Sequence, residues 1–198
     1  MRLLILSMVG CLALCHTYAQ PAADLLTGGF NLKGGVIGLY DGTETEPTVV
    51  IRLDEVHKDY ERKGFFRIGL LPIGVMKGVT FELHHPESVT NSLAQLHQWL
   101  GAGAGKRLEL RRVSFLVSAP ETNRLETGRA RLAADGKLAL LDGVRFASGT
   151  NQIRAGRGVL QITGAQAGQL VLETTPPWTN TLFGRFVTSE PFNQAKAQ

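Results

Sequence analysis

Arginine is the residue type through which this chain could do chemistry, because it is concentrated in one stretch. Residues 106–157 carry eleven Lys and Arg, nine of them Arg, against five Asp and Glu. In the run Arg129-Ala130-Arg131-Leu132, strand alternation sends both arginines to one face. Arg145 and Arg154 join that face if the strands pair in a matching register. These four arginines are the candidate binding residues, since a guanidinium grips phosphate through two hydrogen bonds. A solvated sheet face is the alternative.

No catalytic residue, metal ligand or cofactor is predicted. The segment GAGAGK departs from a phosphate-binding loop, because Leu100 stands where its first glycine belongs and Arg107 where Ser or Thr belongs. His84 and His85 are adjacent, so a strand would turn them to opposite faces, away from a shared metal ion. The acids of Asp54–Glu61 could supply an acid–base pair. An envelope hydrolase therefore stays as one hypothesis.

The first nineteen residues predict export. Arg2 precedes an apolar run from Leu3 to Cys15, and Thr17 and Ala19 stand at −3 and −1 of a cleavage site before Gln20. A helix needs about 20 apolar residues to cross a bilayer, so this run is too short for a permanent anchor. We expect a signal peptide at residues 1–19 and a periplasmic or extracellular mature chain, with a bacterial envelope favoured.

Loss of this leader changes what the remaining chain can do. Cys11 and Cys15 are the two cysteines of the sequence, so the mature chain has no thiol and forms no disulfide. A lipoprotein attached through one of these cysteines is the alternative. Removal of Arg2 lowers the formal net charge from +4 to +3. Export argues against nucleic acid as a partner, and no transmembrane span is predicted in the mature chain.

The elements that carry the arginines are predicted to be strands. We expect a mainly β fold, an antiparallel meander with a jellyroll- or sandwich-like sheet, and one packed amphipathic helix at about residues 88–100. The helix follows from Val89, Leu93, Leu96 and Leu100, whose spacings of 4, 3 and 4 form one face. The expected strands are 36–40, 48–53, 65–71, 79–83, a strand from Lys106 to Val117, 125–133, 137–141, 144–147, 152–155, 159–163 and 169–174.

Charged residues, Gly and Pro mark the expected ends of these strands and the turns between them. The charged stretch Asp54–Gly64 is expected to be helical or a loop, and Pro72 and Gly74 to break the strand that precedes Val79. Asp135-Gly136 and Asp142-Gly143 predict hairpins. A bulge is expected near Arg111-Arg112, where the apolar alternation shifts.

One β-rich domain is expected over residues 20–192. Its possible lobe boundary is the Gly-rich segment 101–105, where the charge balance inverts. A frayed tail is expected at residues 193–198.

From roughly Leu125 to Glu173 the strand spacing resembles that of OstA-like periplasmic proteins of lipopolysaccharide transport. The segments that carry the resemblance are ARLAADGKLALLDGVRFASG and IRAGRGVLQITGAQAGQLVLE. The segment FFRIGLLPIGVMKGVTFEL resembles the AsmA-like lipid-transport group. The OstA-like resemblance implies a β-jellyroll whose interior holds acyl chains. It rests on spacing, so no binding residue is carried over.

These observations predict a non-enzymatic exported cell-envelope protein that binds or passes an anionic amphipathic lipid. The expected partner is an anionic lipid or glycolipid, or another envelope protein. An apolar sheet face would take acyl chains and arginines at its rim would take phosphates. Whether that apolar face lines a closed core or an open groove stays open. A carbohydrate- or protein-binding β-sandwich adaptor, with Trp178 as an aromatic platform, is the main alternative.

Overall fold

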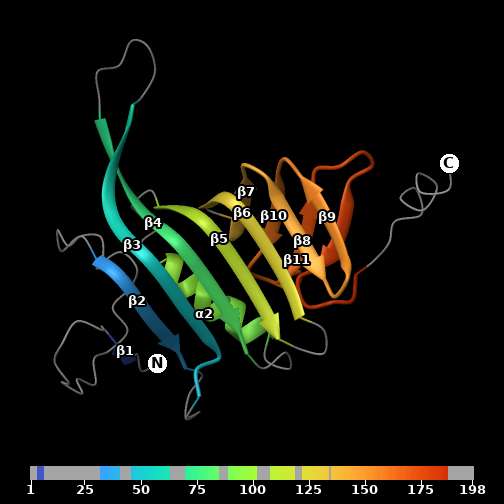
Figure 1. Cartoon of the computed structure of the whole chain (residues 1–198), viewed down its shortest axis with the longest axis horizontal. Coiled ribbons are helices and arrows are strands. Elements are labelled where there is room, and N and C mark those ends of the chain that lie inside the picture. The colour runs from blue at the N-terminus through green and yellow to red at the C-terminus, as the bar shows by residue number, and fades with distance from the viewer. Residues whose placement is uncertain are drawn as a thin grey trace.

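Strands dominate the part of the chain that the structure describes, which is residues 4–6, 32–40, 46–62, 70–84, 89–101, 108–118, 122–133 and 135–186 of a computed structural model. Figure 1 shows the strands in front of a single helix. The elements are β1 (Leu4–Leu6), β2 (Leu32–Leu39), β3 (Val49–Arg62), β4 (Leu70–Leu83), α2 (Val89–Gly101), β5 (Leu108–Ser118), β6 (Thr122–Leu132), β7 (Lys137–Leu141), β8 (Val144–Ser148), β9 (Asn151–Ala155), β10 (Gly158–Gln161), β11 (Gln169–Leu172) and β12 (Trp178–Thr181).

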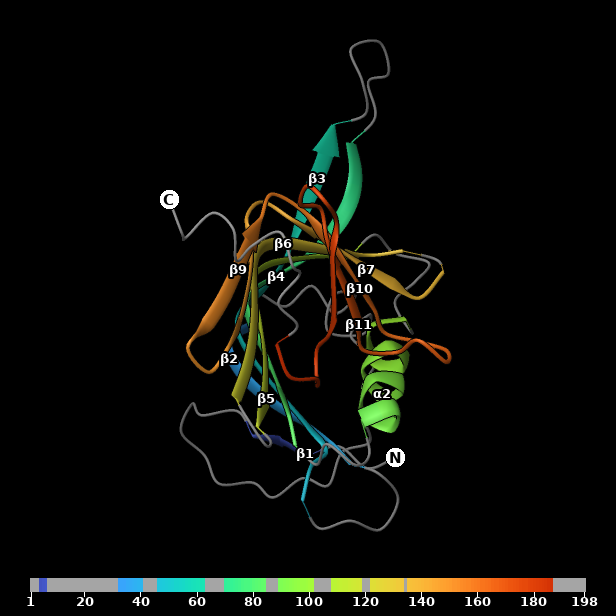
Figure 2. The same ribbon diagram turned by 90° about the vertical axis from the view of Figure 1, so that its right-hand side faces the viewer.

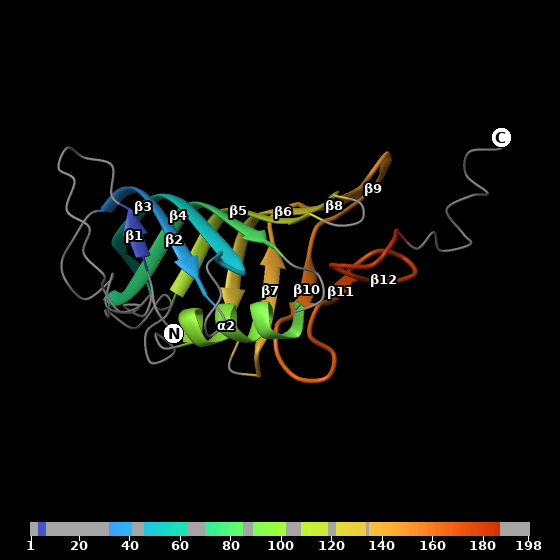
Figure 3. The same ribbon diagram turned by 90° about the horizontal axis from the view of Figure 1, so that it is seen from below.

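All twelve strands belong to one sheet. Its main order is β1-β2-β3-β4-β5-β6-β7-β10-β11-β12, and the β8–β9 hairpin branches from β6. Every pair is antiparallel except β4–β5, which is parallel and is joined through α2. Seen from below, α2 lies under the sheet, with β7 and β10 descending beside it (Figure 3). The predicted mainly β, antiparallel fold with one helix is confirmed; the parallel pair is an addition to the prediction.

The helix α2 covers the inner face of the sheet. It spans Val89–Gly101, within one residue of the predicted range. Leu93 and Leu96 are fully buried, and Trp99 and Leu100 are 1 % exposed, so the apolar face packs into the core as expected. The same core takes buried side chains from β2 to β12, which are at most 6 % exposed, and partly buried residues such as Leu108 and Leu132 pack against it. The apolar face therefore lines a closed core in this structure and forms no open groove within the described residues.

The prediction of a helix or loop at Asp54–Gly64 was wrong. Strand β3 continues through Arg62 and pairs with β4 as far as Arg62↔Leu70. Glu55 and Asp59 lie on the face away from the buried Val56, where they pair with Lys77 and Arg111, whereas Lys58 has the parity of Val56 and is exposed. Non-local pairing therefore overrides the local composition. Figure 1 shows the β3–β4 ribbon extending beyond its neighbours.

The break predicted at Pro72 and Gly74 is also absent, because β4 is continuous from Leu70 to Leu83. The parallel partner β5 begins at Gly74↔Leu108, so Pro72 lies where one side of β4 is an edge. Proline is tolerated on an edge because no ladder bond is lost there. Of the predicted strand 65–71, residues 65–69 lie outside the described residues.

Of the two predicted hairpins, one is confirmed and one is wrong. Asp135-Gly136 joins β6 to β7, which pair antiparallel. Strands β7 and β8, however, do not pair with each other; both run antiparallel to β6, at different levels. Between the pairs Glu126↔Arg145 and Arg129↔Leu141, β6 contributes two residues, whereas the segment that runs from β7 into β8 contributes three. Asp142-Gly143 is thus a bulge. The two residues have φ of +63° and +79°, and positive φ values of this kind suit a bulge as well as a hairpin turn.

This bulge splits the sheet into two arms. One arm is β8–β9 and the other is β7–β10–β11–β12, and Figure 2 shows β9 on one side with β10 and β11 on the other. Phe146 of β8 and Trp178 of β12 close the space between them, with ring centroids 5.5 Å apart. Asn123 of β6 donates to the carbonyls of Leu182 and Gly184, both at 2.9 Å. The two arms therefore share one core.

A line of irregular residues crosses the sheet from β2 to β6. We call it the transverse seam; its members lie in register on successive strands but are left out of the regular ladder. They are Gly34, Asp54, Gly78, Arg112 and Gly128. Gly34, Gly78 and Arg112 have φ of +68°, +61° and +53°. At Gly78 a Cβ would lie 2.0 Å from Asp54 Oδ2, so only glycine fits there.

The seam explains the shift in alternation that predicts a bulge near Arg111-Arg112. Leu110 and Val113 both face the core, so the alternation does shift at this point. The pairs Arg111↔Arg129 and Val113↔Thr127, however, enclose one residue on each strand. The feature is a kink shared by neighbouring strands, without the extra residue of a bulge.

Candidate anion-binding surface

The outer face, which is the face of the sheet turned away from α2, carries all four predicted arginines. Their strand neighbours Ala130, Phe146 and Ile153 are buried on the opposite face. The arginines are therefore not at the rim of the apolar face, as the sequence predicted, but on the other side of the sheet. Arg129 and Arg131 lie on one side of the seam, and Arg145 and Arg154 on the other.

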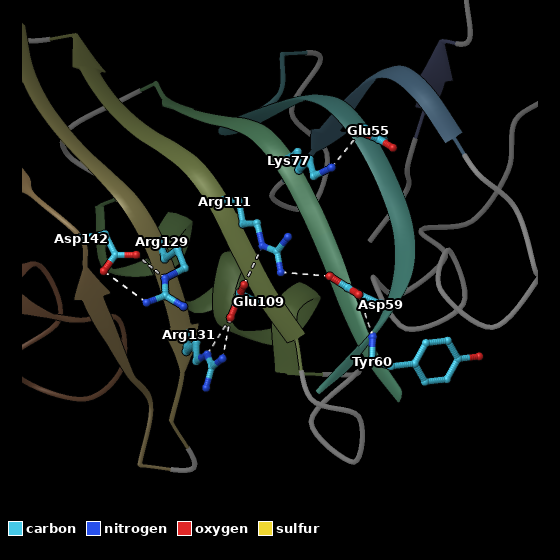
Figure 4. Close-up of polar contacts among 9 residues, drawn as sticks. All are labelled: Glu55, Asp59, Tyr60, Lys77, Glu109, Arg111, Arg129, Arg131 and Asp142. Atoms are coloured by element: carbon cyan, nitrogen blue, oxygen red, sulfur yellow. Dashed lines mark hydrogen bonds and ion pairs between the residues drawn. The ribbon is translucent and has the colours of Figure 1, made fainter. Parts of the chain in front are cut away.

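On the first side, Glu109 organises a set of ion pairs that we call the paired cluster (Figure 4). Its side chain is only 2 % exposed. Oε1 accepts from Arg111 Nε at 2.6 Å, and Oε2 accepts from Arg131 Nη2 at 2.6 Å. Arg111 also donates to Asp59 Oδ2 at 3.1 Å. Strands β3, β5 and β6 thus contribute to one chain of charges.

Two further ion pairs flank this chain. Arg129 donates to both carboxylate oxygens of Asp142, which belongs to the bulge. Lys77 of β4 lies 3.4 Å from Glu55 of β3. In full, the paired cluster is Glu55, Asp59, Lys77, Glu109, Arg111, Arg129, Arg131 and Asp142. Its cations and carboxylates are equal in number, so it has no net charge to offer a ligand.

The pKa values agree with this pairing. Burial alone would raise the pKa of Glu109, but hydrogen bonds and charge from Arg111 and Arg131 outweigh burial and lower it. The hydrogen bond from Arg129 lowers the pKa of Asp142. The backbone N–H of Tyr60, 2.8 Å from Asp59 Oδ1, is the main cause that lowers the pKa of Asp59. These carboxylates stay ionised at neutral pH, as counter-ions of the arginines.

Across the seam, a group of three arginines contains one carboxylate, which forms ion pairs with two of them. We call this group the open cluster: Arg124, Glu126, Arg145 and Arg154. Arg124 Nη2 lies 2.6 Å and Arg145 Nη1 3.7 Å from the two oxygens of Glu126. The Arg124 and Arg145 side chains are 56 % and 47 % exposed. This part of the outer face carries a positive excess.

Arg154 is the least satisfied member of the open cluster. It lies directly opposite Arg145 on the neighbouring strand, and Arg145 turns its Nε to Gln152 Oε1 at 3.1 Å. No described carboxylate forms an ion pair with Arg154. Like charges directly opposite each other destabilise a sheet. An anion held between these guanidiniums would remove that cost.

Apolar side chains lie beside the open cluster on the same face. Leu116 and Ala147 flank Arg124 in register, one on β5 and the other on β8. Both are half-buried. The surface therefore offers positive charge next to apolar area, which suits a molecule with an anionic and an apolar part.

Three of the acids in the segment proposed for a hydrolase are engaged in ion pairs. Asp54 contacts Arg112 at 3.2 Å, and Glu55 and Asp59 belong to the paired cluster. The side chain of the fourth, Glu61, lies outside what the structure describes. His84 lies 4.0 Å from Glu82, and His85 is outside the described residues. Over the described ranges no group of three or more His, Cys, Asp or Glu could hold a metal ion.

Trp178 is not the open aromatic platform that the adaptor hypothesis requires. It is 3 % exposed, and its ring centroid lies 5.3 Å from that of Phe186 and 5.5 Å from that of Phe146. Trp99 of α2 is also buried in the core, at 1 % exposed.

The residues missed from the sequence are mainly the counter-charges. Arg124 and Glu126 differ in parity from Arg129 and Arg131, so strand alternation alone would place them on the opposite face. The seam at Gly128 shifts the alternation of β6 and brings all four to the outer face. Glu109 and Asp142 also have no local signal, because each meets its arginine through strand pairing.

Comparisons of the chain with protein-family models, with curated protein sequences and with solved structures return no match. No described helix combines the length and the apolar character needed to cross a membrane. Of the predicted leader, the structure describes Leu4–Leu6, which form β1; the segment 193–198 lies outside the described residues.

Proposed function

We propose that this chain is a non-enzymatic exported protein of the cell envelope that binds an anionic amphipathic lipid through the open cluster. One observation carries the proposal: Arg124 and Arg145 share the single carboxylate of Glu126 on an exposed face, while Arg154, directly opposite Arg145, has no described carboxylate partner. The leader-like residues 1–19 support export, and the OstA-like strand spacing supports a lipid as the ligand.

Phosphate is the anion that this geometry suits. A guanidinium binds phosphate oxygens bidentately, and two guanidiniums on opposed strands can hold one phosphate between them. Leu116 and Ala147 would contact the part of the lipid next to the phosphate. The ligand thus lies along the outer face, and the closed core takes no part in binding.

The test is sedimentation of the purified protein with vesicles. We expect vesicles of phosphatidylglycerol to bind it, and vesicles of phosphatidylcholine to bind it far less. The double variant Arg145→Gln/Arg154→Gln should bind at least tenfold more weakly, since each cation near an anionic surface contributes about 1 kcal/mol.

The matched control is Arg52→Gln/Arg112→Gln, which removes the same charge from the same face. Arg52 is paired with Glu82 at 2.7 Å and Arg112 with Asp54 at 3.2 Å. We expect this variant to bind nearly as well as the wild type. An equal loss in both variants, or equal binding to the two kinds of vesicle, would overturn the proposal. Displacement by millimolar inorganic phosphate would show that the phosphate group itself is recognised.

A further inference from the structure

The outer edge of β2 is completed by residues of the predicted leader. β1 pairs antiparallel with β2 through Leu4↔Gly38, Ile5↔Ile37 and Leu6↔Val36. On its other side β2 is paired with β3 from Leu32 to Leu39. The segment that would be cut off on export is therefore the edge strand of the sheet.

Among the described residues, cleavage after Ala19 would leave the outer edge of β2 without a paired strand. Its N–H and C=O groups at Val36–Gly38 would lose their partners, and such an edge invites another strand. The usual protection is weak: β2 contains no Pro, and its one charged residue, Lys33, lies at the far end. The kink at Gly34, with φ of +68°, confines the regular edge to Gly35–Leu39.

We infer that a second copy of this chain covers that edge, with β2 pairing to β2 of the copy about a two-fold axis at Ile37. A two-fold axis makes the strands antiparallel, which is the direction β1 already takes. Opposite Ile37, the copy's Ile37 replaces Ile5. Opposite Gly38, the copy's Val36 replaces Leu4. Opposite Val36, the copy's Gly38 replaces Leu6. The copy thus presents an apolar side chain at two of the three register positions that the leader strand occupies.

The pairing also continues the core. Ile37 and Leu39 are 2 % and 0 % exposed on the inner face of β2. Joining two such edges makes one sheet across the dimer and leaves neither β2 edge open. This inference rests on the proposed export, because the edge opens only when the leader is removed.

The test uses the absence of cysteine from the processed chain. Ile37→Cys places a thiol opposite its own copy, where antiparallel Cα atoms lie about 4.5–5.5 Å apart, within disulfide range. Ile51→Cys is the matched control. Ile51 is equally buried and faces Ile37 from β3, on the interior side, where no copy can reach it.

The full chain is expressed in an exporting bacterium, and the mass of the purified protein shows whether residues 1–19 are gone. For processed protein under mild oxidation we expect a cross-linked dimer from Ile37→Cys, none from Ile51→Cys, and a wild-type dimer by native mass spectrometry. Processed protein that stays monomeric, or that cross-links equally at both positions, overturns the dimer and leaves export intact. Protein that retains residues 1–19 overturns export and the dimer together.

Discussion

Two groups of arginines lie on the same face of the same sheet, yet their surroundings differ. In the paired cluster, Arg111, Arg129 and Arg131 each have a carboxylate partner, and one of these, Glu109, is 2 % exposed. In the open cluster, Arg124 and Arg145 share Glu126, and Arg154, which directly opposes Arg145, has no described carboxylate partner. A count of positive residues along the chain treats the two groups as one surface. Only the open cluster has more cations than carboxylates and can offer positive charge to a ligand.

The difference lies in what each cluster contributes to the fold. Strands β3, β5 and β6 meet at Glu109, so the paired cluster ties the outer face together. Arg145 and Arg154 lie on the β8–β9 arm, whose strand pairing with the rest of the sheet is through β6. We expect the paired cluster to govern stability and the open cluster to govern binding.

The largest expected effect is that of Glu109→Gln. It removes the buried carboxylate that Arg111 and Arg131 share, although Arg111 keeps its ion pair with Asp59, and it should lower the free energy of unfolding by about 3 kcal/mol. Glu126→Gln is the matched change in the open cluster, and because Glu126 is more exposed it should cost less than about 1 kcal/mol. Urea unfolding followed by circular dichroism measures both. Equal costs would erase the distinction between the clusters.

Acid should weaken the paired cluster next. The pKa values of Glu109 and Asp142 are lower in the folded chain than their ordinary values of 4.5 and 3.8. Their stabilising contribution is therefore complete above the unfolded-state pKa and is lost as the pH falls through the folded-state pKa. We expect the urea midpoint to fall between about pH 5 and pH 2. The fall should be smaller in Glu109→Gln, and an identical acid profile in that variant would contradict the assignment.

The boundary between the clusters, the transverse seam, can be tested through Arg112→Gly. Arg112 has a φ of +53°, which costs a non-glycine residue about 1–2 kcal/mol. Glycine removes this cost, so we expect stability to rise by up to about 1 kcal/mol despite the loss of the exposed ion pair with Asp54. Arg124→Gly, also in a strand and paired with a carboxylate, should instead lower stability by about 0.5–1 kcal/mol. Thermal unfolding should show changes in stability of opposite sign for the two variants. Changes of the same sign would mean that the positive φ of Arg112 does not carry the expected cost.

The smallest effect sharpens the comparison most. Arg154→Glu converts the opposed pair with Arg145 into an ion pair and should raise stability by about 0.5 kcal/mol. The same variant should lose binding to phosphatidylglycerol vesicles. Arg131→Glu, its counterpart in the paired cluster, should be destabilising because it sets a second carboxylate against Glu109. A destabilised Arg154→Glu would show that the two arginines are not in conflict.

Local pattern was enough to predict several elements. The helix α2 follows from the spacing of four apolar residues, and β7 has the bounds predicted for it, Lys137–Leu141. The second half of β3 could not be predicted, because its charged residues form a strand only when β4 lies alongside. The Asp142-Gly143 pair shows another limit: positive φ suits both a hairpin and a bulge, and the choice depends on how β6 pairs.

The candidate site divides in the same way. Alternation places Arg129 and Arg131 on one face, and the structure puts Arg145 and Arg154 on that face too. The ion pairs of the paired cluster could not be predicted, because the partners are far apart in the sequence. Glu109 is 22 residues from Arg131, and Asp59 is 52 residues from Arg111. Such partners are fixed by register, which depends on the whole sheet.

Register is also where the transverse seam has its widest consequence. A one-residue slip of any strand from β2 to β6 would put its kinked residue opposite a regular one and would expose its core side chains. Gly78, for example, would move out from beneath Asp54 and leave a side chain in its place. The seam therefore fixes the register of these strands, because a strand without an irregular residue at that level would not pair with its neighbours there. In a chain that must find its pairings without a disulfide, this mutual exclusion would suppress mispaired sheets during folding.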